Sequence, residues 1–344
     1  MGEALLELRG VSVQYRRGKT VIRALDDVSL QVGLNETVGL VGESGSGKST
    51  VGRAVLGLAP IHAGSVIFAG DDVTHLRFKD RRGFYRNVQV VFQDPYGSLN
   101  PVRTIARTLA EPLEAYGSHD KAANRRRVQA MLERVHLPPD AADRYPRQFS
   151  GGQRQRIAIA RALMLSPRLV ICDEAVSALD LSVQAQILNL LHELQVELGL
   201  SYLFISHDLE IVRHSCDRVV VLYHGQVMET GPTARVSSLP AHPYTYALHQ
   251  AVPLPNPRLQ RQHRLGAKPS VAAGPVESPD QCPFAPRCPH AEAICWSQRP
   301  TLRPSGQGLV ACHRYPEWQA ERSSAGNGAA TPARALRLTP GRNA

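Results

Sequence analysis

The chain has 344 residues, a length that allows one large domain with an appendage or two modest domains. Its composition, 43% hydrophobic and 20% charged, is that of an ordinary soluble protein. It has no apolar run of about 18 residues that could span a bilayer, and its start, MGEALLELRG, lacks the apolar segment of a signal peptide, so we expect a cytoplasmic protein. The formal net charge is +10. We attribute it to a solvated face or to attraction to anionic lipid headgroups. We expect no nucleic-acid partner, because the basic clusters contain no interleaved aromatic residues on which bases could stack.

Two strands are predicted at the start of the chain. Residues 6–15, LELRGVSVQY, alternate in the manner of a strand, and residues 21–34 supply further strand material. Tyr15 closes the first of these strands. Its ring could lie against a nucleotide base or could pack at the edge of a sheet, and the residue alone does not decide between the two.

Residues 42–50 read GESGSGKST, which matches the phosphate-binding pattern G-x-x-x-x-G-K-[ST]. A short buried strand is predicted before this loop, at 36–41, and a helix after it, at 51–58. The loop glycines let successive backbone N–H groups point inward at phosphate oxygens, and the helix N-terminus adds partial positive charge. Lys48 supplies a full charge, and the Ser49 hydroxyl is placed to ligate Mg²⁺. The loop therefore predicts binding of a nucleoside triphosphate.

A hairpin and a further strand follow the first helix. Residues 64–68 and the turn at 69–71 predict the hairpin at the edge of a sheet, and the apolar run 88–92 predicts a buried strand. That strand ends in Gln93, whose side chain could reach Mg²⁺ or an attacking water.

From residue 100 to about 167 the pattern becomes helical, which predicts a helical subdomain inserted between strands. The expected helices are 102–116, 121–135 and 153–165. Ser150, Gly151 and Gly152 precede the third helix and could offer a hydroxyl and free backbone N–H groups to an anion, although a plain helix cap explains the same residues.

Two more buried strands are predicted at 168–172 and 201–205, on either side of a helix at 181–198. The first strand ends in Asp173 and Glu174, and because ligands of α/β sheets lie outside the carboxyl ends of strands, these acids fit Mg²⁺ binding and water activation. The second strand is followed by His207, a fair candidate for a γ-phosphate contact.

Together these elements resemble the ATP-binding subunit of an ABC transporter, over about residues 5–235. The resemblance rests on Tyr15 as the adenine-stacking aromatic, GESGSGKST as the Walker A loop, Gln93 as the Q-loop, FSGGQRQR as the signature, LVICDE as Walker B, SALD as the D-loop and His207 as the switch histidine. Phe149 stands where Leu is commoner in the signature.

The resemblance implies an α/β P-loop NTPase fold of the ABC type, with a mixed sheet core, an antiparallel β subdomain and an inserted helical subdomain. It also implies ATP and Mg²⁺ as ligands and two ATPase subunits, identical or paralogous, that sandwich two ATP molecules. In that arrangement Ser150 to Gly152 contact the γ-phosphate bound to the partner. The implied catalytic residues are Glu174, His207 and Gln93, and the implied Mg²⁺ ligands are Ser49, Gln93 and Asp173. The implied ATP-binding residues are Tyr15, Gly42, Ser44, Gly45, Ser46, Gly47, Lys48, Ser49, Thr50, Ser150, Gly151, Gly152, Gln153 and Asp180.

The segment after the core narrows the resemblance. Residues 239–255 and the C-P-x-x-P-R-C pattern at 282–288 resemble the extension found in ATPases of peptide and nickel importers. Four cysteines cluster here as C-x₅-C-x₆-C-x₁₆-C: Cys282, Cys288, Cys295 and Cys312. Four thiols in a reducing compartment suit a zinc site, an iron–sulfur cluster or free thiols, and the usual C-x₂₋₄-C knuckle of structural zinc is absent. In the resembling peptide importers the corresponding cysteines hold a [4Fe–4S] cluster, which we therefore expect.

We divide the chain into an ABC ATPase domain (1–250, with the helical subdomain at about 100–167), a linker (251–280), a small Cys-rich extension (281–320) and a disordered tail (321–344). The expected function is ATP hydrolysis that powers uptake of di- or oligopeptides through two permease subunits. An extracytoplasmic binding protein would deliver the peptide to the permease. We expect this chain to be peripheral on the cytoplasmic face of the inner membrane. The alternatives are the same role for nickel or another small solute, and a nucleic-acid-linked ABC ATPase. We also expect the ATP site to survive loss of the cysteine centre, because its motifs all precede residue 210.

Overall fold

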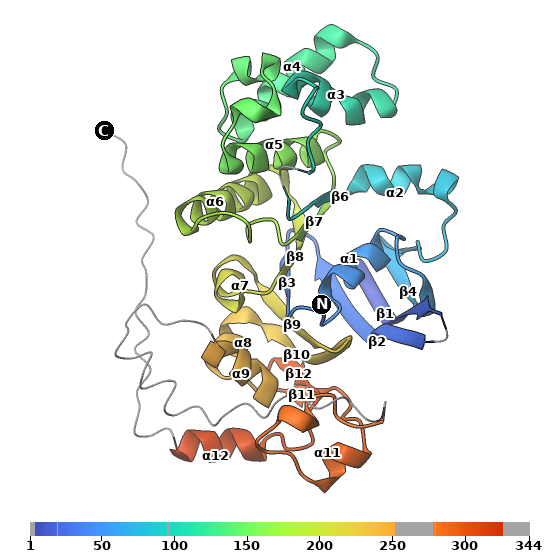
Figure 1. Cartoon of the computed structure of the whole chain (residues 1–344), viewed down its shortest axis with the longest axis vertical. Coiled ribbons are helices and arrows are strands. Elements are labelled where there is room, and N and C mark those ends of the chain that lie inside the picture. The colour runs from blue at the N-terminus through green and yellow to red at the C-terminus, as the bar shows by residue number, and fades with distance from the viewer. Residues whose placement is uncertain (1–3, 19, 95–96, 252–277, 279, 326–344) are drawn as a thin grey trace.

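The central element of the fold is a mixed sheet whose inner strands are parallel (Figure 1). In the computed structural model, which describes residues 4–18, 20–94, 97–251, 278 and 280–325, this sheet has eight strands. In sheet order they are β11 (Arg303–Ser305), β12 (Gly308–Val310), β10 (Gln226–Pro232), β9 (Arg218–Tyr223), β3 (Thr37–Val41), β8 (Ser201–Ser206), β7 (Leu169–Asp173) and β6 (Val88–Val91). The five strands from β9 to β6 run parallel, and β10, β12 and β11 extend the sheet antiparallel from β9.

The inner strands separate two apolar cores. Successive side chains of a strand point to opposite faces, so Val170 and Phe204 pack with the helical subdomain, whereas Ile171 and Ile205 pack with the second sheet. All residues of β3 and β8 are buried, as parallel strands covered on both faces require. This double burial explains why these strands appear in the sequence as continuous apolar runs.

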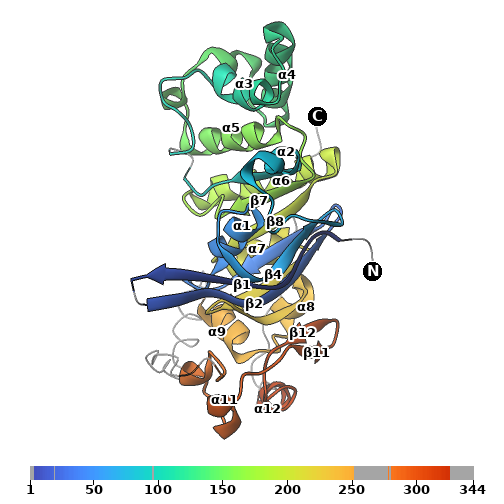
Figure 2. The ribbon, with the colours of Figure 1, turned by 90° about the vertical axis from the view of Figure 1, so that its right-hand side faces the viewer.

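The second sheet is antiparallel, and its strand order is β2–β1–β4–β5. Its strands are β1 (Ala4–Arg17), β2 (Thr20–Gly33), β4 (Ile61–Phe68) and β5 (Asp71–Asp72). The predicted N-terminal strands and the predicted edge hairpin are thereby confirmed. Figure 2 shows β1 and β2 as a long twisted ribbon that extends to one side of the molecule.

Helices flank the central sheet, and three of them form the predicted helical subdomain at one end of the molecule (Figures 1 and 2). That subdomain consists of α3 (Ile105–Ala115), α4 (Lys121–Arg134) and α5 (Gly151–Leu163). The helices of the ATPase core are α1 (Lys48–Val55), α2 (Arg82–Asn87), α6 (Leu181–Leu198), α7 (Leu209–Ser215), α8 (Thr233–Ser238) and α9 (Pro243–Ala251). Short 3₁₀ turns occupy Phe78–Arg81, Pro139–Asp143, Pro146–Gln148 and Ala285–Arg287.

Side-chain caps fix where the helices of the subdomain begin. Thr104, Asp120 and Ser150 each accept a hydrogen bond from a backbone N–H of the first turn. The first helix therefore begins at Ile105 rather than at the predicted residue 102. The sequence analysis did not predict α2, a short helix whose sequence, RGFYRN, has little apolar periodicity.

The segment after residue 280 is joined to the ATPase core. It contains α11 (Ala293–Ser297), β11, β12 and α12 (Glu317–Ala325), and β12 pairs with β10 through Val310 opposite Glu229. Trp318 of α12 is 1% exposed, and its indole N–H donates to the carbonyl of Ala241 at 2.7 Å. The extension thus adds two strands to the central sheet and shares its core. The domain boundaries remain a prediction: most of the linker and residues 326–344 of the tail lie outside the described residues, and α12 runs past the predicted start of the tail to residue 325.

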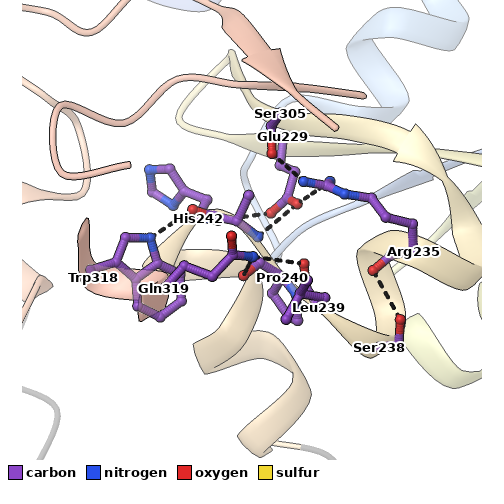
Figure 3. A network of polar contacts seen from close by, with 10 residues as sticks. Glu229, Arg235, Ser238, Leu239, Pro240, His242, Ser305, Trp318 and Gln319 are labelled. Carbon is purple, nitrogen blue, oxygen red and sulfur yellow. Dashed lines mark hydrogen bonds and ion pairs between the residues drawn. The ribbon is translucent and has the colours of Figure 1, made fainter. Parts of the chain in front are cut away.

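A buried ion pair stands at this junction (Figure 3). The Glu229 carboxylate is 0% exposed and accepts from Arg235 at 2.7 Å and from the backbone N–H groups of Ala241 and His242 at 2.8 and 2.9 Å. Arg235 also donates to Ser305 of β11. A single buried carboxylate therefore connects β10, α8, the segment before α9 and the extension.

Candidate nucleotide-binding site

The phosphate loop lies between β3 and α1 and is held closely against β9 and β2. A Cβ on Gly42 would lie 2.1 Å from the carbonyl oxygen of Leu222, and one on Gly47, whose φ is 104°, would lie 2.6 Å from that of Ala24. Only glycine fits these two positions. Because the strained loop ends at Gly47, α1 begins at Lys48 and not at the predicted residue 51.

Lys48 and Ser46 place a buried cation and a buried hydroxyl inside the loop. Lys48 is 5% exposed, and its ammonium donates to the carbonyls of Gly42 and Glu43 at 2.8 and 2.9 Å. Burial lowers the pKa of Lys48, although nearby carboxylates, Glu174 foremost, oppose that shift. The buried Ser46 hydroxyl has no partner among the described residues. A buried cation and an unpartnered buried hydroxyl in a loop that leads into the start of a helix fit the phosphates of ATP.

Two carboxylates lie at the carboxyl end of β7, as the sequence predicted. The Ser49 hydroxyl donates to Asp173 Oδ1 at 3.0 Å, and burial raises the pKa of Asp173 while this hydrogen bond opposes the shift. Among the described residues, no three His, Cys, Asp or Glu side chains could hold a metal ion. Ser49 and Asp173 nevertheless fit Mg²⁺, because that ion is usually held by one or two carboxylates together with phosphates of the substrate.

Glu174 and His207 lie together across the ends of β7 and β8. Glu174 has a positive φ of 51°, and its N–H donates to the carbonyl of Ile205 at 3.0 Å. Its Oε2 is 3.5 Å from Nδ1 of His207. The structure therefore brings together Lys48, Ser49, Asp173, Glu174 and His207, which are spread over 160 positions of the sequence.

The signature residues begin α5 within the helical subdomain, which both views place apart from α1 (Figures 1 and 2). Ser150 and Gln153 form a reciprocal capping box, in which the hydroxyl accepts from Gln153 N at 3.3 Å and the amide accepts from Ser150 N at 3.0 Å. Gly152 lies so close to α6 that a Cβ would be 2.5 Å from Cγ1 of Val183. The N-cap reading of these residues is correct, and it leaves backbone N–H groups of the first turn available.

The remaining predicted residues lie at the edges of the site. Tyr15 is half-buried near the end of β1, where it pairs with Ile22 of β2, and Gln93 is exposed just after β6. Asp180 caps α6, accepting from Val183 N at 3.0 Å, and its hydrogen bond with Ser182 is the main cause that lowers its pKa.

Comparison with known proteins identifies the architecture. Residues 25–177 match the family described as ABC transporter, and residues 228–295 match the oligopeptide/dipeptide transporter C-terminal region. A protein of Brucella abortus (strain 2308), named for peptide import as an ATP-binding protein, is 48% identical over 303 residues, which cover 87% of this chain and 88% of that protein. A Brucella suis biovar 1 (strain 1330) protein with the same kind of name is 47% identical over 313 residues, or 90% of this chain and 98% of that protein. The chain belongs to the ABC transporter family.

Solved structures agree with this assignment. A dimeric ATP-binding cassette in a post-hydrolysis state, bound to ADP and Pi, matches with a TM-score of 0.60 and 30% identity, covering 66% of this chain and 98% of its own. The protein cbiO1 from Clostridium perfringens, part of the ABC transporter complex cbiONQ, matches with a TM-score of 0.61 and 26% identity, covering 68% and 90%. The predicted fold class and family are confirmed, and as an ABC ATPase the chain couples ATP hydrolysis to transport.

The four cysteines of the extension are all reduced, and they are not arranged as a metal site. Burial raises the pKa of Cys282 to about 11 and those of Cys288 and Cys312 to about 12. Two of the four cysteines are in direct contact, because the Cys282 N–H donates to the Cys295 carbonyl at 2.8 Å. However, no three or more His, Cys, Asp or Glu side chains in the described part of the chain could hold a metal ion, so the geometry does not support the predicted [4Fe–4S] cluster.

Sequence reasoning missed the contact between the extension and the phosphate loop of this ABC ATPase. Arg287 and Tyr244 both bind Glu43, the second residue of the loop. Arg287 lies within the C-P-x-x-P-R-C pattern, but no sequence signal links it to a residue 244 positions away.

Proposed function

We propose that this ABC ATPase powers the import of di- or oligopeptides through a membrane permease. The observation that carries the proposal is the match of residues 228–295 to the oligopeptide/dipeptide transporter C-terminal region. The names of relatives that are 47–48% identical over most of the chain support it. No contact in the described residues favours nickel or nucleic acid as an alternative.

In the proposed site, Lys48 and Ser46 bind phosphate oxygens and Tyr15 stacks on adenine. Ser49, Asp173 and Gln93 would hold Mg²⁺, which neutralises charge on the phosphates when bound. Glu174 polarises the attacking water. His207, 3.5 Å from Glu174, orients that carboxylate and contacts the γ-phosphate.

The site is completed by a second ATPase subunit. The first turn of α5 offers backbone N–H groups at a helix N-terminus, and Ser150 adds a hydroxyl that its capping bond only weakly holds, at 3.3 Å. In the proposed dimer these groups bind the γ-phosphate of ATP held by the partner, and Asp180 fixes the start of α6 behind them.

A cavity of about 650 Å³ lies where α2 meets the helical subdomain, and its lining makes it a candidate for the permease contact. It is lined by Arg86, Leu113, Tyr116, Arg127, Met131 and Arg134, among others. We propose that a cytoplasmic helix of a permease subunit, with an acidic side chain, occupies it, because the lining combines apolar groups with three arginines. Arg127→Glu should abolish stimulation of the ATPase by the permease without changing basal hydrolysis, and unchanged stimulation would contradict this docking.

The transport assignment is tested by reconstitution with two permease subunits and an extracytoplasmic binding protein in vesicles. We expect a short peptide to stimulate ATP hydrolysis and to accumulate, and Ni²⁺ to do neither. Stimulation by Ni²⁺ alone would overturn the peptide assignment. None of the helices that the structure describes could cross a membrane, so the chain is proposed to be peripheral, bound to the cytoplasmic face through the permease.

The [4Fe–4S] cluster stays a prediction that rests on resemblance. In its favour, backbone N–H groups of Phe284, His290 and Arg314 are directed at the sulfurs of Cys282, Cys288 and Cys312, and such bonds also stabilise cluster-bound thiolates. Anaerobically purified protein should contain four irons and four sulfides per chain, and Cys282→Ser should remove the brown colour. One zinc and no iron would replace the cluster with a zinc site.

A further inference from the structure

The phosphate loop is held at one residue, Glu43, by the C-terminal extension and by α9. Arg287 of the extension donates to the Glu43 carboxylate from both terminal nitrogens, from Nη1 to Oε2 at 2.7 Å and from Nη2 to Oε1 at 2.9 Å. The backbone N–H of Glu43 donates to the Tyr244 hydroxyl of α9 at 2.9 Å. The loop is thus fixed through both its main chain and a side chain.

Arg287 and Tyr244 are themselves held rigidly. Tyr244 is 0% exposed, and its ring lies 4.4 Å from that of Tyr223 and 5.4 Å from that of Phe284. The Arg287 guanidinium stacks over the same two rings at 5.9 and 5.7 Å. Since aromatic packing and a bidentate pair both restrict rotation, the contact transmits the position of the extension to the loop.

Glu43 in turn holds the group that meets the phosphates. Its carbonyl accepts from Lys48 Nζ at 2.9 Å and from the N–H of Ser46 at 3.1 Å. A shift of the Glu43 peptide therefore moves Lys48 and the loop N–H groups together. The Glu43 carboxylate is also a negative charge beside the site of an anion, and Arg287 neutralises it.

We propose that Arg287 and Tyr244 are positioning residues of the ATP site, and that the extension sets the affinity for ATP through Glu43. Arg287 acts by holding the Glu43 side chain and cancelling its charge, and Tyr244 acts by fixing the Glu43 peptide. Neither residue touches the reacting atoms. The proposal rests on the ATPase activity of the family and is independent of which solute is transported.

The test compares single and double variants of the full chain, assembled with its permease. We expect Arg287→Gln to raise the KM for ATP by about 2- to 30-fold and to leave kcat nearly unchanged. This is the range by which substitutions of residues that touch no ligand change the affinity of a distant site. Tyr244→Phe, which removes only the hydroxyl, should change KM in the same direction. Equilibrium binding of MgATP to the full-length subunit should weaken in parallel.

Rescue and a matched control separate this role from general loosening. Glu43→Gln combined with Arg287→Gln should recover most of the affinity, because the uncompensated charge is gone. Arg299→Gln breaks another pair between the extension and the core, Arg299 to Asp26 at 2.7 Å, and should leave KM unchanged. A KM for Arg287→Gln within twofold of wild type, an equal rise in Arg299→Gln, or a double variant worse than either single would each overturn the proposal.

Discussion

The buried pair of Glu229 and Arg235 gives a prediction whose size follows from the structure. Arg235→Met keeps the length of the side chain but removes the cation 2.7 Å from a carboxylate that is 0% exposed. Glu229 keeps the N–H groups of Ala241 and His242, but its charge is left uncompensated away from water. Removing one partner of a buried pair costs about 3–5 kcal/mol, which for a chain of 344 residues lowers Tm by roughly 4–7 °C. The pair in Figure 3 should therefore be among the most sensitive in the molecule.

The loss should depend on pH, with a defined sign. Burial raises the pKa of Glu229, so the folded state binds its proton more tightly than the unfolded chain does. The contribution of this group to the free energy of unfolding therefore falls as pH rises through the interval between the unfolded and folded pKa. Arg235 opposes that rise, so Arg235→Met raises the folded pKa further. The deficit of the variant should be smallest in acid and largest above neutral pH.

Urea denaturation at several pH values measures this effect. Glu229→Gln in the Arg235→Met background should restore part of the stability, since it removes the uncompensated charge. Its amide oxygen can still accept one of the two backbone bonds, which reach different oxygens of Glu229. Arg125→Met is the matched control: its pair with Asp143 has the same 2.7 Å separation but is exposed, so we expect no measurable change in Tm. If Arg235→Met is as stable as Arg125→Met, the reasoning from burial is wrong.

Three further predictions concern the ATP site. Glu174→Gln should lower the ATPase rate by about 10²–10⁴-fold while ATP still binds and the dimer stays closed, and near wild-type turnover in the reconstituted complex would remove Glu174 from its role. Lys48→Ala should weaken ATP binding itself, which equilibrium measurements would show; unchanged affinity means that Lys48 is not the phosphate lysine. Gly152→Ala should lower ATPase activity by up to about 10²-fold, because its Cβ would lie 2.5 Å from Val183 and displace the start of α5. Adding Val183→Ala should restore that activity, and a double variant no better than the single would show that close packing is not the cause.

Much of the fold could be predicted because each element carries its own local signal. The helix at 181–198 matches α6 at both ends, since Asp180 caps its start and Gly199, in a left-handed conformation, ends it. The strands β3, β7 and β8 were visible as apolar runs because both of their faces are buried. Helix α2 was missed because six residues with two arginines show no period. Tertiary contacts hold it in place, among them the packing of Phe84, which is 6% exposed, and the hydrogen bond from Tyr85 to the carbonyl of Leu56.

By itself the sequence predicted the chemistry of the nucleotide site: local spacing marks the phosphate loop, and the rule that strand ends carry ligands marks the polar residues after β7 and β8. The role of the residues at the start of α5 came from the family resemblance. Only the tertiary structure decided how the extension relates to that site. The motifs of the ATP site all precede residue 210, and nothing in the sequence links them to the extension. The structure pairs β12 with β10 and Arg287 with Glu43. Local patterns cannot reveal such pairings, because strand partnership and ion pairing between distant residues depend on which faces meet after the chain has folded.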